Sequence, residues 1–174
     1  MLLRGELHAI LGVETQNIPQ LEIRAIYSGR LEFFATKDFL RTVQKRLSRK
    51  TLRPRDLTGI TVFTDSHAHT RQGIGIPMAL ADVGFDNLGQ FEITSFEAAI
   101  NLASMGLGIA VIPDRNAEKA VNSGSIVPMK IEGLRSSTSL EYRICLSTLR
   151  NSPYQEAIHA LYLQLQSVLG KGPI

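Results

Sequence analysis

The side chains best suited to chemistry in this sequence lie between Asp65 and His69, in the pattern D-x-H-x-H. Two imidazoles two residues apart, preceded by a carboxylate, can supply one face of a zinc site. A structural zinc site needs a fourth ligand, and the other histidines, His8 and His159, are remote in the sequence. A polar loop before a helix explains the same residues, and we favour it. His67 and His69 are therefore weak metal candidates, and the sequence predicts no metal and no cofactor.

Motifs for catalysis are missing from the rest of the sequence. Ser95 has neither the G-x-S-x-G elbow nor an evident base beside it. Glu92 and Glu97 are better explained as a strand end and a helix cap than as an acid–base pair. The glycines of Gly106-x-Gly108 lack the rest of a nucleotide-binding motif. The sequence thus predicts that the protein is not an enzyme.

The segment from Thr94 to Pro113 predicts a helix, a glycine stop and a strand buried on both faces. Thr94 and Glu97 have the spacing of a capping box. The free amides at the start of this helix, with the hydroxyls of Thr94 and Ser95, suit a carboxylate or another small anion. A second group of polar residues ends the predicted strand at 59–64, on the side of an open sheet where ligands usually bind: Thr64, Asp65 and Ser66. These residues predict a binding site.

The order of residues 95–114, S-x-E-A-A-I-x-L-x-x-x-G-L-G-I-A-x-I-P-D, resembles the effector-binding domain of LysR-type transcriptional regulators. GELHAILG at 5–12, LRPRDLTGITVF at 52–63 and GSIVPM at 124–129 resemble other segments of that family, and Ser152-Pro153 opens a final helix in the same way. The resemblance covers nearly the whole chain in the family's order.

The resemblance implies an α/β fold of the type 2 periplasmic-binding-protein-like class, with a ligand cleft between two lobes. Residues 1–57 and 148–174 would form the first lobe and residues 58–147 the second. Relative to the family, a winged helix-turn-helix, a linker helix and two strand–helix units would be absent, so the first lobe would be incomplete. The strand at 5–12 would then have an unpaired edge, and the final helix an uncovered apolar face. Such surfaces usually pair with another chain, so we expect a homo-oligomer.

Site residues follow from the same resemblance, position by position. Arg30 precedes a strand and could pair with an anion through two hydrogen bonds. With the residues derived above, the predicted ligand-binding set is Gly12, Val13, Arg30, Thr64, Asp65, Ser66, Gln90, Thr94, Ser95, Ile112 and Pro113.

The elements that position these residues follow from composition and periodicity. The 174 residues are 44% hydrophobic and 20% charged, as in an ordinary globular chain. Strands are predicted at 5–13, 21–26, 30–36, 59–64, 91–93, 109–112, 126–129 and 141–148. Helices are predicted near 71–83, from Thr94, at 114–121 and from Ser152. Their alternation predicts an α/β architecture.

The remaining features of the sequence concern charge, sulfur and location. Seven of the 19 basic residues lie between Arg41 and Arg55 without an acid, as in a phosphate-binding stripe. The same segment has an apolar helical face of Phe39, Leu40, Val43 and Leu47, so we favour a helix whose basic face is solvated.

Cys145, the one cysteine, excludes an internal disulfide. No run of 18 apolar residues and no secretory signal is present, which predicts a cytoplasmic protein without a membrane span.

These observations together predict the effector-sensing domain of a LysR-type transcriptional regulator. It would bind a small, anionic metabolite, and it would contact DNA only through the winged helix-turn-helix that this sequence lacks. Two alternatives stay open: a small-molecule binding protein of the periplasmic type, and a truncated partner that dimerises with a full-length regulator.

Overall fold

The protein is described by a computed structural model that covers residues 1–14, 18–48, 50–65, 69–70, 75–85, 89–134 and 137–170. Its strands and α-helices, in chain order, are β1 (Ala9–Val13), β2 (Leu21–Ala35), α1 (Lys37–Leu47), β3 (Thr61–Asp65), α2 (Ile76–Asp82), β4 (Gly89–Ile93), α3 (Phe96–Ser104), β5 (Ile109–Pro113), α4 (Asp114–Asn122), β6 (Val127–Pro128), β7 (Glu141–Leu149) and α5 (Gln155–Leu169). Three short 3-10 helices are η1 (Leu2–Arg4), η2 (Pro54–Leu57) and η3 (Thr138–Leu140).

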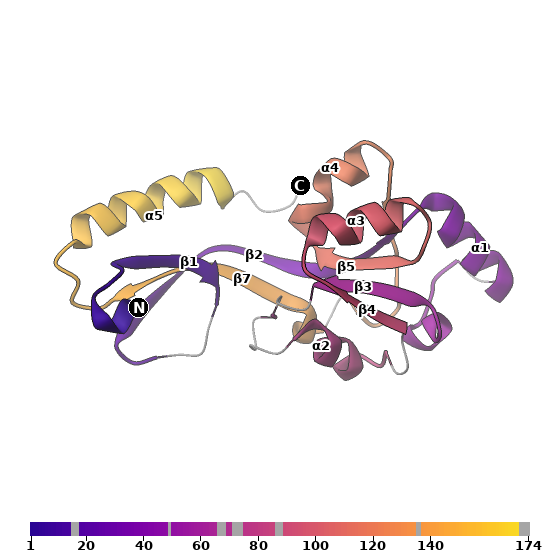
Figure 1. Ribbon diagram of the computed structural model, residues 1–174, viewed down its shortest axis with the longest axis horizontal. Helices are drawn as coiled ribbons and strands as arrows, with labels where there is room; N and C mark the ends of the chain where they lie inside the picture. The colour runs from indigo at the N-terminus through magenta and orange to yellow at the C-terminus, as the bar shows by residue number, and fades with distance from the viewer. Residues whose placement is uncertain are drawn as a thin grey trace.

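The strands join in one seven-stranded sheet of order β1-β7-β2-β5-β3-β4, with β6 pairing with β2. β3 runs parallel to β4 and β5, and the other pairs are antiparallel. The molecule is elongated, and β2 and β7 run along its long axis between the two ends (Figure 1). The predicted alternation of strands and helices is confirmed.

β2 is the strand that connects the two ends of the molecule. Its residues from Leu21 to Arg30 pair with β7, and those from Leu31 to Phe34 pair with β5. The sequence predicted two extended segments here, but the backbone forms one strand of 15 residues. The pairing with β7 shifts register between Ala25 and Tyr27, so β2 contains a β-bulge within the part that pairs with β7.

The sheet has two halves that differ in their covering. The closed half comprises β3, β4, β5, β6 and residues 31–35 of β2, with α3 and α4 on one face and α2 on the other (Figure 1). The open half comprises β1, β7 and residues 21–30 of β2, with α5 on one face. The two clusters of the closed half contain most of the buried apolar side chains, whereas the cluster beneath α5 has three, Ile26, Leu146 and Ile158.

Residues 31–57, which the sequence analysis assigned to the first lobe, pack with the closed half. Leu31, Val43 and Leu57 belong to the same hydrophobic cluster as Val62 of β3. Packing therefore favours a border between lobes inside β2, next to Arg30, over a border at residue 57.

Helix α3 begins one residue later than the predicted capping box implies. Ser95 is the cap, and its hydroxyl accepts a hydrogen bond from the Ala98 amide at 3.2 Å. The backbone of Ser95 is extended, with φ of −159°, and this conformation brings the Ser95 hydroxyl to the end of the helix. Thr94, one residue earlier, is exposed. The predicted glycine stop is confirmed, since Gly106 has a φ of 76° directly after the helix.

Other element ends also differ from the sequence prediction. β1 starts at Ala9 rather than at residue 5, because Leu2–Arg4 forms a 3-10 helix and Gly5 closes it with a φ of 71°. α2 starts at Ile76, with Pro77 in its first turn, where a proline does not interrupt a helix. Before α5, Gln155 donates to the Arg150 carbonyl, so no capping box forms there.

The first part of the basic segment, up to Leu47, lies in α1, and its apolar face packs as the sequence predicts. Val43 is buried in the closed half, and Phe39, Leu40 and Leu47 lie against the same cluster. The basic side chains of this helix lie on its solvated side, as for Arg41, whose side chain is 66% exposed. In the described residues, no helix combines the length and apolar character that a membrane crossing requires.

Candidate functional site

A cavity of about 420 Å³ lies between the open and closed halves. Both halves supply its walls, and most lining residues sit at the ends of strands or helices. They are Val13, Tyr27, Leu31, Asp65, His69, Phe96, Pro113, Arg115, Asn116, Tyr142, Ile144 and Leu169. We call this cavity the cleft.

The topology of the sheet explains why these residues meet. β3 and β5 are parallel neighbours, so their carboxyl ends, with Asp65 and Pro113, come to the same edge of the sheet. β2 and β7 supply residues on the side of the open half, where Tyr27 pairs in register with Ile144 and both line the cleft. The cleft thus forms where the parallel strands stop and the long antiparallel strands continue.

Two tyrosines and an aspartate form a hydrogen-bonded cluster at the cleft. The hydroxyls of Tyr142 and Tyr27 both donate to Asp114 Oδ1, at 2.8 and 3.2 Å. Burial and the Asp114 carboxylate raise the pKa of Tyr142 far above its usual value. Burial also raises the pKa of Tyr27, although its hydrogen bond with Tyr142 opposes that rise. Both phenols therefore stay neutral donors over the physiological pH range.

Gly29 makes room for this cluster. A Cβ atom at position 29 would lie 2.7 Å from Asp114 Oδ1, from the Tyr142 hydroxyl and from Tyr27 Cε1. Such distances are well inside van der Waals contact, so any side chain here would displace the cluster. Glycine at this point of β2 is a packing requirement of the cleft.

Arg115 connects the two halves beside the cleft. Its guanidinium donates to the carbonyls of Leu169 and Val168 at the end of α5, and it lies 5.1 Å from the centre of the Tyr27 ring. A cation at the C-terminal end of a helix is favourable because the last carbonyls are unpaired and the helix dipole is negative there. Arg115 thus holds α5 of the open half to α4 of the closed half.

Two helices begin at the cleft. Phe96 is the first residue of α3, and Arg115 and Asn116 lie in the first turn of α4. Helix starts present free amides and a positive dipole end, which favour an anionic group. The carboxylates of Asp65, at the end of β3, and of Asp114, the first residue of α4, oppose this preference, so the cleft is electrostatically mixed.

Three of the predicted ligand-binding residues line the cleft, namely Val13, Asp65 and Pro113. Gly12 and Ser95 are direct neighbours of lining residues, and Ser95 uses its hydroxyl to cap α3. Thr64 and Ile112 are fully buried within β3 and β5, while Thr94 is exposed. Ser66 and the metal candidate His67 lie outside the described residues, as does the side chain of Gln90.

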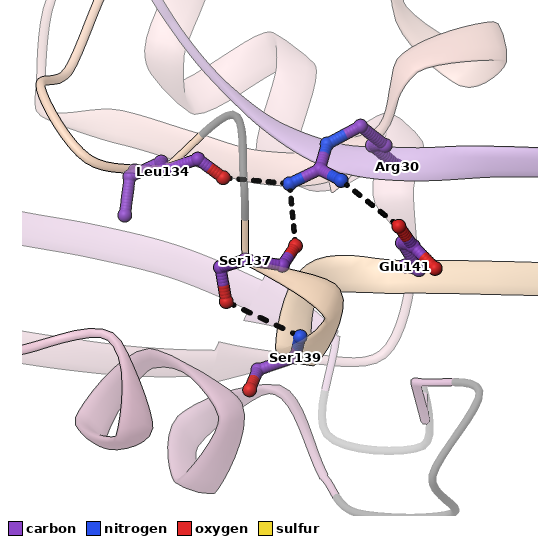
Figure 2. Close-up of polar contacts among 5 residues, drawn as sticks. All are labelled: Arg30, Leu134, Ser137, Ser139 and Glu141. Carbon is purple, nitrogen blue, oxygen red and sulfur yellow. Dashed lines mark hydrogen bonds and ion pairs between the residues drawn. The ribbon is translucent and has the colours of Figure 1, made fainter.

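Arg30 lies outside the cleft and is held by the protein itself (Figure 2). Its guanidinium donates to the carbonyls of Leu134 and Ser137, both at 2.7 Å, and to Glu141 Oε1 at 3.3 Å. These bonds join β2 to the turn before β7 and occupy the donors that the sequence analysis reserved for an anion. Arg30 therefore orients the connection between the halves in this structure.

His69 lines the cleft and forms a β-bridge with Gly75. Over the described part of the chain, no three His, Cys, Asp or Glu side chains gather as metal ligands would. Of the predicted D-x-H-x-H residues, the cleft has Asp65 and His69.

Sequence reasoning missed the cluster of Tyr27, Asp114 and Tyr142 and the bridge by Arg115. Asp114 is 87 residues from Tyr27 and 28 from Tyr142, so no local spacing connects them. One signal was present, since Tyr27 and Gly29 alternate along a strand and share a face. It could have identified a crowded position but not its partners.

Comparisons with known proteins agree with this geometry. A family model described as the LysR substrate binding domain matches residues 1–170. The regulatory domain of NMB2055 (MetR), a LysR family regulator from N. meningitidis, superposes with a TM-score of 0.68 at 13% identity over 95% of this chain and 71% of that chain. No curated protein matches this chain by sequence.

Two further solved structures share the fold. The bromide-bound regulatory domain of HypT from Salmonella typhimurium has a TM-score of 0.68 at 14% identity, over 97% of this chain and 77% of that chain. A sulfate-bound mutant regulatory domain of OxyR2 from Vibrio vulnificus has a TM-score of 0.70 at 16% identity, over 97% and 75%. At these identities the matches concern the fold, and they confirm the predicted type 2 periplasmic-binding-protein-like class.

Proposed function

This chain belongs to the LysR substrate-binding domain family, and from that premise we propose that the cleft binds a small-molecule effector whose occupancy changes how the two halves sit together. The family consists of transcription regulators rather than enzymes, in agreement with the prediction from sequence. A bound effector would thus act by shifting a conformational population.

The single observation that supports this proposal is a cavity with walls from both halves. Its volume of about 420 Å³ falls in the range of small-molecule sites. A ligand that contacts Val13 and Ile144 on one side and Asp65 and Pro113 on the other is bound best when those sides are close. Differential affinity of this kind is what a ligand needs to shift an equilibrium between two arrangements.

The lining suggests an effector with an apolar body and a polar, anionic end. The side chains of Leu31, Phe96 and Ile144 offer apolar surface. Arg115 and Asn116 lie in the first turn of α4, where free amides and the positive dipole end suit a carboxylate. Arg115 would then exchange its carbonyl partners on α5 for the effector.

The wider setting of the domain is part of the same proposal. The family match concerns the substrate-binding domain, so a contact with DNA would come from another part of the regulator. A cytoplasmic location follows from a role in transcription and stays a prediction.

A cavity-filling variant tests the proposal. Purified protein is screened by thermal unfolding against a panel of small metabolites, including aliphatic and aromatic carboxylates, and hits are measured by calorimetry. A ligand at 100 times its Kd adds about 2.7 kcal/mol to stability, equivalent to a rise in Tm of about 5–10 °C for a chain of this size.

Ile144→Trp places an indole in the cleft and should abolish that rise. Leu107→Trp, at a residue that is 54% exposed in the closed half, is the matched control and should retain it. A hit that stabilises the Ile144→Trp protein as much as the wild type would place the binding site elsewhere.

A further inference from the structure

Positive charge is concentrated in one segment of this protein. Seven of the 19 basic residues lie between Arg41 and Arg55, and no acidic residue lies among them. Without this segment, the 16 acidic residues of the chain would outnumber the basic residues that remain, so the net charge of +3 comes from this one region. A local concentration of one sign produces a strong surface potential, which attracts a ligand of the opposite sign.

The structure places this charge at one end of the molecule. α1 lies at the outer end of the closed half, away from the open half (Figure 1). The helix is fixed there because its Val43 is buried in the closed half. The described basic side chains of α1 and of the segment that follows it are all exposed, and they are Lys37, Arg41, Lys45, Arg46, Lys50, Arg53 and Arg55. We call this set the basic end.

Three basic residues form a row along the outer face of α1. Lys37, Arg41 and Lys45 are spaced by four residues, so they lie one above another on the helix. Eight residues of α-helix span about 12 Å, so the row is an extended line of charge. A nucleic-acid duplex carries one negative charge per about 1.7 Å of its axis, so a row of this length can contact several phosphates.

The segment after α1 continues the basic end. Gln44 of α1 donates to the Lys50 carbonyl at 2.6 Å, which holds Lys50 beside the helix. Further along, Arg53 and Arg55 border a surface hollow of about 400 Å³. Arg53 pairs with Glu132 at 2.8 Å, but the two side chains are 44% and 59% exposed. An exposed ion pair is weak, so Arg53 can exchange Glu132 for a phosphate at little cost.

Few carboxylates neutralise the basic end. Arg41 lies 3.6 Å from Asp38, and both side chains are largely exposed, so this pair is also weak. Five of the basic side chains have no carboxylate within ion-pair distance in the part of the chain that the structure describes, and they are Lys37, Lys45, Arg46, Lys50 and Arg55. Most of the charge is therefore available to a ligand.

The basic end offers no apolar surface that a protein or a membrane could bury. Of the exposed large hydrophobic residues in the described chain, none lies between Val13 and Met78. Stable protein interfaces depend on buried aromatic and apolar anchors, and a membrane-bound helix inserts an apolar face. The apolar face of α1 already packs against the closed half, so the basic end can bind through charge alone.

The same surface distinguishes a duplex from a single-stranded nucleic acid. Single strands bind largely through bases that stack on aromatic side chains. Phe39 is the one aromatic residue of α1, and it packs against the cluster of the closed half. Backbone phosphates are thus the group that the basic end can contact, and a duplex presents them in regular rows.

We propose that the basic end binds the phosphate backbone of double-stranded DNA, the duplex that a transcription regulator encounters. Contacts with phosphates position a protein but carry no sequence information, so base-specific reading stays with another part of the regulator. This adds a second, nonspecific DNA contact to the proposed function and does not depend on the effector. The contact would keep the closed half of the domain close to the DNA.

Fluorescence anisotropy with a labelled DNA duplex of arbitrary sequence tests the proposal. At physiological salt, the wild-type chain should bind with a Kd of about 1–100 µM, the range of nonspecific binding. With about four phosphate contacts, the affinity should fall about 150-fold between about 50 and 200 mM NaCl, because each contact releases counterions from the DNA.

A matched pair of double variants locates the contact. Arg41→Gln with Lys45→Gln removes two charges from the basic end, which should weaken binding at least tenfold and reduce the slope of log affinity against log salt by about 2. Arg4→Gln with Lys119→Gln removes one arginine and one lysine from exposed positions elsewhere and should retain the wild-type affinity. Glutamine supports a helix about as well as lysine and arginine do, and circular dichroism checks the fold of both proteins.

Photo-cross-linking gives a second, positional measurement. Thr42→Cys places a thiol at an exposed site of α1, between Arg41 and Lys45. Labelled with a benzophenone maleimide, it should cross-link to the duplex. Leu107→Cys, at an exposed site after α3, is the control that should not cross-link, and Cys145 is 1% exposed and stays unlabelled.

Each outcome decides the proposal. Salt-dependent duplex binding that is weakened in the basic-end variant alone, together with cross-linking at position 42, supports it. A wild type that does not bind the duplex at low salt overturns it, as does equal weakening in the two double variants. Tighter binding to a single strand, to phosphatidylserine vesicles or to polyglutamate than to the duplex also overturns it, and would assign the basic end to that anion.

Discussion

The closed and open halves share the long strand β2, yet they bury their strands very differently. In the closed half, every residue of β5 is buried, because α3 and α4 cover one face and α1 and α2 the other. In the open half, α5 covers one face, and β1 leaves Leu11 and Val13 exposed. Burial of apolar surface is the main source of stability, so the closed half carries most of the folding free energy.

This contrast suits a domain that senses a ligand. A rigid half fixes one wall of the cleft, while the half with few buried contacts can move or accept partners at low cost. The cleft lies at the border, where Arg115 and the tyrosine cluster connect the two halves.

The largest expected effect comes from equal truncations in the two halves. Leu57→Ala removes a fully buried side chain from the closed half and should lower the free energy of unfolding by about 2–5 kcal/mol. Leu11→Ala in the open half should cost about 0.5 kcal/mol or less when monomers are compared, because the side chain is half exposed. Urea denaturation at low protein concentration measures both. Equal losses would remove the distinction between the halves.

At the border, Tyr142→Phe should lower stability by about 1.5–3 kcal/mol, since it removes a hydrogen bond to a carboxylate. Tyr154→Phe, at an exposed tyrosine, is the control and should be neutral.

The same variant predicts a pH dependence. Because the pKa of Tyr142 is raised in the folded state, the contribution of its hydroxyl to the free energy of unfolding is complete below a pH of about 10. This contribution is lost as the pH rises further. Above that pH, wild-type stability should fall relative to Tyr142→Phe by about 1.4 kcal/mol per pH unit. Denaturation at pH 8 and pH 11 provides the comparison, and a constant difference would argue against a raised pKa.

A pair of glycine substitutions separates crowding at the border from open space at the edge. Gly29→Ala should cost about 1–3 kcal/mol, because its Cβ would overlap the tyrosine cluster. Gly12→Ala, in β1, has no atom within 4 Å of its Cβ and should be neutral or stabilise the protein by about 0.4–1 kcal/mol. Thermal unfolding of the two variants side by side is sufficient, and similar Tm values would contradict this account of the cleft.

The smallest effect concerns the link between the halves. Arg115→Met removes the bonds to the carbonyls of Leu169 and Val168 but retains an apolar side chain beside Tyr27. Amide exchange in the last turn of α5 should increase several-fold, while exchange in β3 and β5 stays unchanged. Uniform exchange across both halves would mean that Arg115 does not hold α5.

The sequence predicted local elements well where the hydrophobic periodicity agreed with the residues that end helices and strands. The apolar run that became β5, the apolar face of α1 and the stop at Gly106 follow from neighbouring residues alone. Element starts were less accurate, because Thr94 and Ser95 are both competent caps and the backbone angle of one decides between them.

The candidate site was predictable only at strand ends. Asp65 and Pro113 line the cleft because the parallel strands β3 and β5 end at the same edge of the sheet, and this rule can be applied to a sequence alone. Val13 reaches the cleft from the end of the antiparallel strand β1. Arg30 was assigned to an anion through the family resemblance, and in the fold its guanidinium instead donates to two carbonyls and to Glu141.

By itself, the sequence determined which segments become strands and helices and to which family their order belongs, since these depend on spacing within short windows. Tertiary structure alone decided that Tyr27, Asp114 and Tyr142 share one hydrogen-bonded cluster and that Arg115 reaches the end of α5. Those contacts depend on how a bulged strand crosses the border between two halves, and no pattern along the chain records that crossing.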